Sequence, residues 1–362
     1  MSPTGFHARE VPTPRIRAVN ERRGTLLVDT SFLGDVLCAE PLVRAAAGKW
    51  PNEPVDFLAG PGGGQMLAGH PQLRKLIVFD KRGADQGLGG LRRMAKKLRQ
   101  QRYARAICSH RSWRTAALLR LAGIPVRVGF HNASAAWLYS QRILYRKELH
   151  EVERNLELVG GGHWEAPRMY PGEAERARAK ELLEQLPKAP VALAPGSIWA
   201  TKRWPAAKWG ELLRGLCQAG QSVVMLGGPD DAELCASIVA AGQLDEVPEA
   251  AYLDLSGQTS LRESAAVLES CATLVSNDSA PMHLGVAAGI PVVAIYCSTV
   301  PAFGFAPRGP RDLVLEITNL ECRPCGIHGH KVCPEGHFRC GEDLDSAQAL
   351  RAALERSVSV PV

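Results

Sequence analysis

Short apolar segments rich in Val, Leu and Ile alternate with longer amphipathic segments along the chain. In the first half, the apolar segments lie at 25–28, 55–59, 75–79 and 106–108. The alternation begins again at 191–194 and continues at 222–226, 273–276 and 291–295. Short strands that alternate with helical segments are typical of βαβ units and a parallel sheet. The pattern therefore predicts an α/β protein with two parallel-sheet domains.

A proline-rich boundary separates the two halves. The charged helical segment 173–185 is followed by Pro187 and Pro190, and proline ends a helix before a new strand. We place the interdomain hinge at 186–190, so the first domain covers 24–188 and the second covers 189–345. A last amphipathic helix is predicted within 346–362, with Ser346 as a candidate N-cap. Residues 1–23 carry five arginines and three prolines and predict a flexible tail.

Composition narrows the class of protein. The chain has 362 residues, of which 46% are apolar and 22% charged, which suffices for two hydrophobic cores. No uninterrupted apolar stretch reaches the length of a spanning helix, so we expect a soluble chain. Six of the ten cysteines stand in apolar surroundings, which favours the reducing cytoplasm. The net charge of +6 favours phosphorylated or anionic-lipid partners and does not imply nucleic acid. We also expect the protein to be a monomer.

Ligands of doubly wound sheets bind beyond the carboxyl ends of the strands, and the loop 29–37 follows the first strand. Gly34 and Asp35 stand where this strand turns into a helix. This position places the Asp35 carboxylate at the rim of an interdomain cleft, where it could act as a general base. A helix cap is the alternative role.

The loop 195–205 follows the first strand of the second half. It combines hydroxyls, two adjacent cations (Lys202 and Arg203) and two indoles, and it ends at Pro205, which is tolerated at a helix start. Such a loop suits a diphosphate. Either cation taken alone is more often a solvated surface charge.

The segment 277–283 follows another strand and leads into a helix of small residues. If Asp278 caps this helix, the amides of Ser279 and Ala280 form an anion site supported by the helix dipole. His283 would lie just over one turn further in. The alternative is a well-capped helix in which His283 is a satisfied, half-buried side chain.

Two common nucleotide-binding motifs are missing from the sequence. The glycines at 60–64 resemble a phosphate loop, but Gln65 stands where G-x-G-x-x-G would be completed. We interpret this segment as a flexible loop that lines the cleft. No G-x-x-x-x-G-K-[ST] occurs either. The sequence therefore lacks the motifs that would indicate a nicotinamide dehydrogenase or a P-loop enzyme.

The three loops together resemble glycosyltransferase family 9, the ADP-heptose:lipopolysaccharide heptosyltransferases, and the second heptosyltransferase more than the first. The resemblance runs from about residue 25 to 345. It rests on Thr30-Ser31-Phe32-Leu33-Gly34-Asp35-Val36, on Pro195-Gly196-Ser197 with Lys202-Arg203-Trp204-Pro205, on Asn277-Asp278-Ser279-Ala280-Pro281-Met282-His283, and on a cysteine-rich tail.

The resemblance implies a GT-B architecture, in which two Rossmann-like domains face a cleft. The first domain would hold a lipid-linked acceptor and the second would hold a nucleotide-sugar. Asp35 matches the proposed catalytic base, and Lys202 matches a lysine near the donor phosphates. The remaining donor-binding assignments are Ser197, Thr201, Asp230, Asp278, Ser279, Ala280 and His283. The acceptor-binding assignments are Ser31, Gly34, Arg92 and Arg93. Many relatives have glycine where this chain has Ala280, but the backbone amide is kept.

These parts fit an inverting transfer of heptose from ADP-heptose to the inner core of lipopolysaccharide. Asp35 takes the acceptor proton while ADP leaves from the opposite face. No metal or other cofactor is required if Lys202 and the helix amides neutralise the leaving diphosphate. A related enzyme with another nucleotide-sugar or surface glycan is the first alternative. A noncatalytic nucleotide-sugar-binding protein is the second.

The cysteine-rich tail has spacing typical of a structural zinc site, with His328, His330 and His337 nearby. A reduced, packed loop near the donor cleft is the alternative. The candidate ligands are Cys322, Cys325, Cys333 and Cys340.

The segment 91–105 carries seven Lys and Arg residues and no acid, while Leu91, Met94, Ala95 and Leu98 repeat at helical spacing. It predicts a basic amphipathic helix. Such a helix could meet the anionic inner face of the cytoplasmic membrane or the phosphates of a lipid acceptor. A solvated outer face is the usual alternative.

Overall fold

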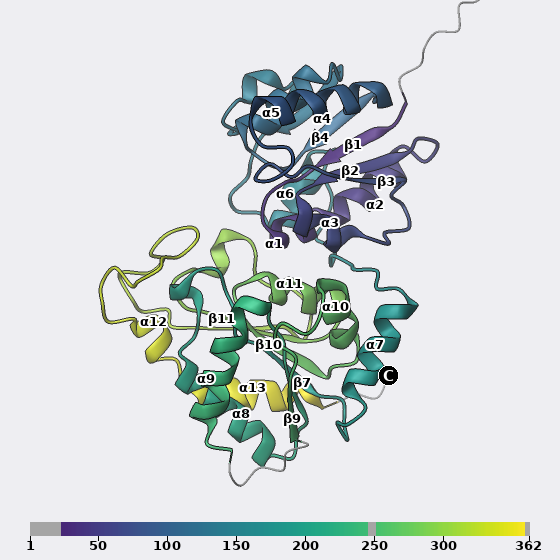
Figure 1. Ribbon diagram of the computed structural model, residues 1–362. Helices are drawn as coiled ribbons and strands as arrows, with labels where there is room; N and C mark the ends of the chain where they lie inside the picture. The colour runs from purple at the N-terminus through teal and green to yellow at the C-terminus, as the bar shows by residue number, and fades with distance from the viewer. Residues whose placement is uncertain (1–22, 245–250, 359–362) are drawn as a thin grey trace, which may run out of the picture.

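The computed structural model describes residues 23–244 and 251–358, which form two α/β lobes (Figure 1). The tail predicted at 1–23 therefore lies outside the described residues except for its last position. Within the described ranges, no helix has the length and apolar character needed to cross a bilayer.

Each lobe contains one six-stranded sheet, and every strand pair in both sheets is parallel. The first sheet has the order β3-β2-β1-β4-β5-β6 and the second has the order β12-β11-β10-β7-β8-β9. Both follow the Rossmann order, which confirms the predicted α/β class with two parallel-sheet domains. The strands are β1 (Thr25–Val28), β2 (Val55–Ala59), β3 (Lys75–Val78), β4 (Arg105–Cys108), β5 (Val126–Phe130), β6 (Gln141–Ile143), β7 (Val191–Ala194), β8 (Val223–Met225), β9 (Tyr252–Asp254), β10 (Thr273–Asn277), β11 (Val292–Tyr296) and β12 (Leu313–Glu316).

Helices cover both faces of each sheet, so the central strands are buried throughout, as in other parallel sheets. The first lobe has α1 (Leu33–Cys38), α2 (Glu40–Lys49), α3 (Pro61–Leu67), α4 (Gly87–Gln101), α5 (Trp113–Leu121), η1 (Ala136–Leu138) and α6 (Glu151–Glu157). The second lobe has α7 (Glu173–Leu183), η2 (Ala200–Lys202), α8 (Ala206–Gln218), η3 (Pro229–Asp231), α9 (Ala232–Gly242), α10 (Leu261–Glu269), α11 (Ala280–Ala288), η5 (Pro301–Phe303), α12 (Arg339–Glu342) and α13 (Ser346–Ser357).

The chain changes lobes earlier than the sequence predicts. Helix α7 packs against α10 of the second lobe, and Arg176 forms an ion pair with Glu269 at 2.7 Å. The crossing therefore falls between α6 and α7, not at 186–190, because the apolar side of α7 is buried on the second lobe (Figure 1). Helix α13 also packs on this lobe. Its N-cap is Asp345, whose Oδ1 accepts from the Ala347 amide at 3.0 Å, and Ser346 is its first helical residue.

Two local predictions differ from the structure. The glycines after β2 form helix α3 instead of a flexible loop, because Pro61 starts the helix and the glycines let α3 approach α1. A Cβ atom on Gly62 would lie 2.7 Å from Leu33 Cδ2. The predicted basic helix begins at Gly87 and ends at Gln101, since Arg102 takes a left-handed conformation with φ 56°.

The two lobes pack directly against each other. Leu37 of α1 and Met66 of α3 belong to the same buried cluster as Val267 of α10 and Leu284 of α11. Helices α1 and α3 therefore lie over α10 and α11, as Figure 1 shows. The loop after β1 consequently meets the helix that follows β10.

Candidate functional site

Asp35 lies in the first turn of α1, at the junction between the lobes. Its Oδ2 accepts a hydrogen bond from the Phe32 amide at 3.3 Å, so it does cap the helix start, with a long bond. Burial raises the pKa of Asp35 from 3.8 to about 7, and the nearby carboxylates of Asp29 and Glu151 add to this rise. The Phe32 amide and Arg111 oppose it. A carboxylate with a pKa near 7 is suited to take up a proton at neutral pH.

Asp278 and Lys202 form an ion pair at the carboxyl ends of β7 and β10. Lys202 Nζ donates to Asp278 Oδ2 at 2.6 Å, and Thr299 Oγ1 donates to the same oxygen at 2.6 Å. Asp278 therefore does not cap α11 as the sequence suggests, because its carboxylate is turned toward these two donors. Ser279 takes the N-cap position instead.

The N-terminus of α11 carries polar groups that have no hydrogen-bond partner within the described residues. The Ser279 Oγ atom is buried, and no partner for it exists among the described residues. Ala280 begins the helix, and the first amides of a helix have no partner inside it. Together with the adjacent Lys202 ammonium group, these donors have the chemistry expected of an anion site.

His283 of α11 packs against α1 of the other lobe, at Gly34 and Cys38. A Cβ atom on Gly34 would lie only 2.8 Å from His283 Cδ2, so glycine is needed for this close approach. His283 Nδ1 lies 3.7 Å from Cys38 Sγ. Burial lowers the pKa of His283 to about 4, so the imidazole is neutral at pH 7.

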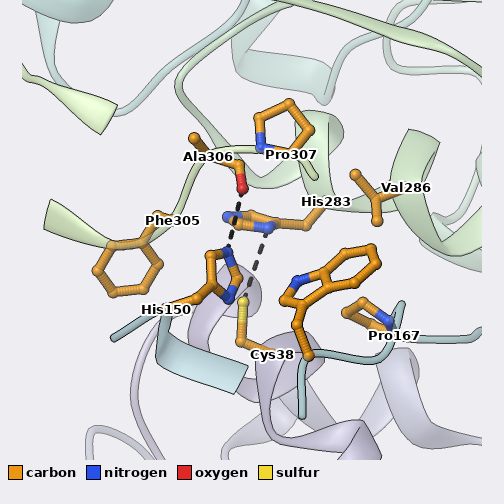
Figure 2. Close-up of a pocket in the computed structure, with 9 residues that line it drawn as sticks. Cys38, His150, Pro167, His283, Val286, Phe305, Ala306 and Pro307 are labelled. Carbon is orange, nitrogen blue, oxygen red and sulfur yellow. Dashed lines mark hydrogen bonds between the residues drawn. The ribbon is translucent and has the colours of Figure 1, made fainter. Parts of the chain in front are cut away.

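A small cavity beside this contact shows how tightly the lobes meet. Figure 2 shows His150 and Cys38 of the first lobe pointing toward His283 and the Ala306 carbonyl of the second. His150 Nε2 lies 3.1 Å from the Ala306 oxygen. The cavity measures about 10 Å³, which leaves room for one water molecule at most.

The predicted donor loop is held in place by a buried side chain that the sequence analysis did not assign to a role. Asn277 Nδ2 donates to the Pro195 carbonyl at 2.6 Å, and its Oδ1 accepts from the Trp204 amide at 3.1 Å. Asn277 thus ties both ends of the loop to β10. Within the loop, the Ser197 hydroxyl accepts from the Trp199 amide at 3.4 Å.

Two donor assignments have a different environment from the one expected. Thr201 is buried, and its hydroxyl donates to Ser298 Oγ at 3.1 Å and accepts from the His330 amide at 2.7 Å. It therefore holds the loop instead of facing a ligand. Asp230 lies exposed on η3 after β8, whereas the next carboxylate, Asp231, accepts from the Gly228 amide at 2.9 Å.

The residues assigned to the acceptor lie in two separate regions of the first lobe. Gly34 lies at the lobe junction, and the Ser31 hydroxyl donates to the Asp29 carboxylate beside it. Arg92 and Arg93 lie on the exposed face of α4, where Arg93 donates to the Ala84 carbonyl at 2.6 Å. Arg93 is thus bound to the loop that precedes α4 and not to Asp35.

A polar cluster that sequence reasoning missed lies closer to Asp35. Thr30 Oγ1 is 2.8 Å from Lys81 Nζ and 2.9 Å from His110 Nδ1. Arg111 follows His110 and stacks on the Tyr145 ring, with its Cζ 4.3 Å from the ring centroid. The signal was available in principle, since Thr30, Lys81 and His110 follow β1, β3 and β4.

The four cysteines predicted as candidate zinc ligands lie near one another, since the neighbouring thiols all act on Cys340. In the ranges 23–244 and 251–358, no three His, Cys, Asp or Glu side chains are arranged to hold a metal. The Cys325 thiol donates to the Cys322 carbonyl at 3.2 Å, and Cys340 is buried on α12 while Cys333 is half-buried in a loop. Burial, followed by the neighbouring thiols, raises the pKa of Cys340 to about 11.

The histidines of this segment contact the donor loop instead. The His328 ring stacks on Trp199 with 6.1 Å between the ring centroids, and it meets Phe32 of the first lobe edge-on at 6.0 Å. His330 binds Thr201 through its backbone. Through His328 the segment therefore bridges the start of α1 and the donor loop.

The sequence and the fold are both similar to those of known proteins. The sequence model of glycosyltransferase family 9 (heptosyltransferase) matches residues 91–337. Lipopolysaccharide heptosyltransferase 2 of Escherichia coli is 27% identical over 293 residues, which cover 77% of this chain and 84% of that protein. Lipopolysaccharide heptosyltransferase 1 of Pseudomonas aeruginosa is 29% identical over 314 residues, which cover 83% and 85% of the two chains.

The fold is also found in a solved structure, that of the E. coli ADP-heptose LPS heptosyltransferase II. It superposes with a TM-score of 0.77 and 24% identity, over 92% of this chain and 98% of the other. At this identity the likeness concerns the fold alone, and that fold is the predicted GT-B architecture.

Proposed function

Since this chain belongs to glycosyltransferase family 9, the heptosyltransferases, we propose that it transfers heptose from ADP-heptose to the inner core of lipopolysaccharide. The names of its relatives support heptose transfer to lipopolysaccharide, and the name of the similar solved structure supports ADP-heptose as the donor. The observation that carries the proposal is the contact of Gly34 with His283. It brings α1, which contains Asp35, against α11, whose N-terminus is the proposed anion site. A proton acceptor and a leaving-group pocket thus share one crevice.

The donor would bind with its diphosphate at the N-terminus of α11. The Ser279 hydroxyl and the Ala280 amide would donate to it, and Lys202 would supply the compensating charge. Lys202 donates to the carboxylate and the carbonyl oxygen of Asp278 in the free protein, and an ammonium group has three donors. Asp278 keeps the Thr299 hydroxyl when Lys202 turns toward the phosphates. Asp230 would reach the nucleoside from the end of β8.

The reaction would be a single displacement. The acceptor oxygen forms a bond to the anomeric carbon as the bond from this carbon to the diphosphate breaks, and the configuration inverts. The hydroxyl proton passes to Asp35, and ADP takes the electron pair of the broken bond. General-base assistance of this kind contributes about 10²- to 10⁴-fold. Lys202 and the α11 amides neutralise the leaving group, so no metal ion is needed in this scheme.

Mass-spectrometric detection of heptose transfer to a panel of truncated core acceptors tests the proposal. ADP-heptose should be used in preference to competing UDP- and GDP-sugars, and a variant that lacks the Asp35 carboxylate should bind it without transfer. Preference for another nucleotide-sugar would support the related-enzyme alternative. Tight ADP-heptose binding without transfer to any acceptor would support the noncatalytic alternative.

We also propose that the first lobe works at the inner face of the cytoplasmic membrane, where a lipid-linked acceptor is held. The exposed cations of α4 support this, because a basic face is attracted to anionic headgroups. Two exposed apolar side chains, Leu88 and Trp113, lie in the first turns of α4 and α5. Arg114 of α5 donates to the Gly87 carbonyl of α4 at 3.1 Å, which holds the starts of the two helices together. Sedimentation with phosphatidylglycerol vesicles should fall in the Lys96→Glu variant and in high salt. Binding that ignores both would contradict the electrostatic contact.

A further inference from the structure

Three aromatic side chains from distant parts of the chain meet where the two lobes face each other. Phe32 is the N-cap of α1, Trp199 belongs to the donor loop 195–205, and His328 belongs to the cysteine-rich segment. The His328 ring lies nearly parallel to the Trp199 ring, with 13° between the planes, and it meets the Phe32 ring edge-on. We call these three side chains the aromatic cluster. It contains one ring from the first lobe and two from the second.

The aromatic cluster is attached at one end to the segment of the proposed base and at the other to the proposed donor site. The Phe32 amide donates to the Asp35 carboxylate at 3.3 Å, so the Phe32 ring belongs to the residue that caps the base. Gly329, the neighbour of His328, packs on the donor loop. A Cβ atom on Gly329 would lie 3.2 Å from Lys202 Cγ, and its φ of 93° also favours glycine. The cluster therefore links the two groups that the proposed reaction uses.

The charged neighbours of His328 come from both lobes. Burial lowers the pKa of His328, and Lys202 of the second lobe and Arg111 of the first lower it further, whereas Asp278 opposes the change. Because the ordinary pKa of histidine is already below 7, the His328 ring is neutral at pH 7. An uncharged ring suits a neutral group of a ligand better than it suits a phosphate.

The aromatic cluster is partly exposed, and its polar edges have no partners. Phe32 is 47% exposed, and Ile198 and Ile327, which precede the other two rings, are 74% and 58% exposed. Within the ranges 23–244 and 251–358, neither Trp199 Nε1 nor the His328 ring nitrogens make a hydrogen bond. A group of exposed apolar side chains with polar edges is typical of a binding site.

A sugar ring matches these features. One of its faces carries C–H groups that pack on aromatic rings, and its edge carries hydroxyls that can bind ring nitrogens. We propose that the aromatic cluster binds a sugar, with the ring faces against its C–H groups and the nitrogens of Trp199 and His328 on its hydroxyls. The inference rests on the proposed function for the presence of a sugar between the lobes. That sugar belongs either to the donor or to the acceptor, and the two tests below separate these sources.

The binding test compares ADP-heptose with ADP by isothermal titration, in the absence of acceptor. If the cluster holds the donor sugar, Trp199→Leu and His328→Leu should each weaken ADP-heptose binding about three- to ten-fold, the effect expected for one aromatic contact. The ADP affinity should be unchanged, and Trp199→Phe should retain most of the ADP-heptose affinity. Trp137→Leu is the matched control, since it removes an exposed ring outside the cluster. Equal losses of ADP-heptose and ADP affinity would place the rings on the nucleotide and overturn the proposal.

The transfer test measures the acceptor KM and the donor KM separately. If the cluster holds the acceptor sugar, Phe32→Leu and His328→Leu should raise the acceptor KM about three- to ten-fold and leave the donor KM unchanged. Phe32→Tyr, which keeps the ring, should behave like the wild type. An ADP-heptose affinity and an acceptor KM equal to those of Trp137→Leu in every variant would overturn the proposal.

Failure of the proposed function gives a different result. If the wild type prefers another nucleotide-sugar, the proposed function fails, and the same comparison of that nucleotide-sugar with its own nucleotide tests the aromatic cluster. If the leucine variants bind the nucleotide-sugar more weakly but no sugar is transferred by the wild type, the cluster stands and the proposed function fails. Unchanged nucleotide-sugar affinity in a protein that transfers no sugar would overturn both.

Discussion

Replacement of Asp35 by asparagine should abolish transfer and stabilise the protein at the same time. Asparagine keeps the shape of the side chain and an oxygen for the Phe32 amide at 3.3 Å, but it cannot take up a proton. We expect turnover to fall about 10²- to 10⁴-fold, which is the rate enhancement that a general base contributes. The affinity for ADP-heptose should change little. In the wild type, kcat/KM should fall as the pH drops below about 7, where Asp35 becomes protonated.

The gain in stability follows from the raised pKa of Asp35. The folded protein holds the Asp35 proton more tightly than the unfolded chain does. The contribution of Asp35 to the free energy of unfolding is therefore greatest below pH 3.8 and decreases as the pH rises to about 7. The difference between 3.8 and about 7 corresponds to about 4 kcal/mol at most, at ~1.4 kcal/mol for each pH unit. Since the side chain is partly open to the crevice, we expect about 2 kcal/mol, or a Tm increase of ~4–8 °C at pH 8.

Thermal unfolding of Asp35→Asn and the wild type between pH 5 and pH 8 measures this effect. The Tm difference should grow with pH and level off above pH 7 to 8. Glu148→Gln is the control, because it neutralises an exposed carboxylate of the same lobe. A Tm difference independent of pH would refute the assigned environment of Asp35. Full transfer activity in Asp35→Asn would refute its role as base.

Further substitutions probe the donor side and the lobe contact. Lys202→Met should weaken ADP-heptose binding at least ten-fold in calorimetry, since a charged partner of the diphosphate is lost, and unchanged affinity would exclude Lys202 from the donor site. Gly34→Ala would place a methyl group 2.8 Å from His283 Cδ2 and should lower turnover by separating the lobes, whereas Gly48→Ala, with no atom within 4 Å, should leave turnover intact. Equal activity of these two variants would show that this lobe contact is not used. Asn277→Leu should lower the free energy of unfolding by about 2–4 kcal/mol in urea titrations, because it leaves the Pro195 carbonyl and the Trp204 amide unsatisfied. A change below 1 kcal/mol would mean that Asn277 does not clamp the loop.

The strand pattern was readable in the sequence because central parallel strands are continuous apolar runs. Edge strands such as β6 and β9 are short and carry exposed or half-buried residues, so their pattern was not recognised. The helix α3 was missed because glycine usually disfavours helices, and only its packing on α1 explains it. The crossing between the lobes was misplaced because the charged sequence of α7 resembles a linker. Only its packing against α10 assigns it to the second lobe.

The three candidate loops were selected because they follow strand ends, where doubly wound sheets bind their ligands. What the sequence could not provide was the direction of each side chain. Thr201 turns into the cysteine-rich segment, and Asp278 turns to Lys202 instead of capping α11. The contacts of Lys81 and His110 with Thr30 were overlooked because a single polar residue in a loop has no sequence pattern of its own.

The pairing of Asp35 with the α11 pocket across the lobe junction is the central claim, and a crystal structure with intact ADP-heptose in the Asp35→Asn variant tests it most directly. The account predicts a diphosphate bound by the Ala280 amide, Ser279 and Lys202, with the anomeric carbon turned toward position 35. A diphosphate bound elsewhere, or an anomeric carbon that faces away from position 35, would contradict it.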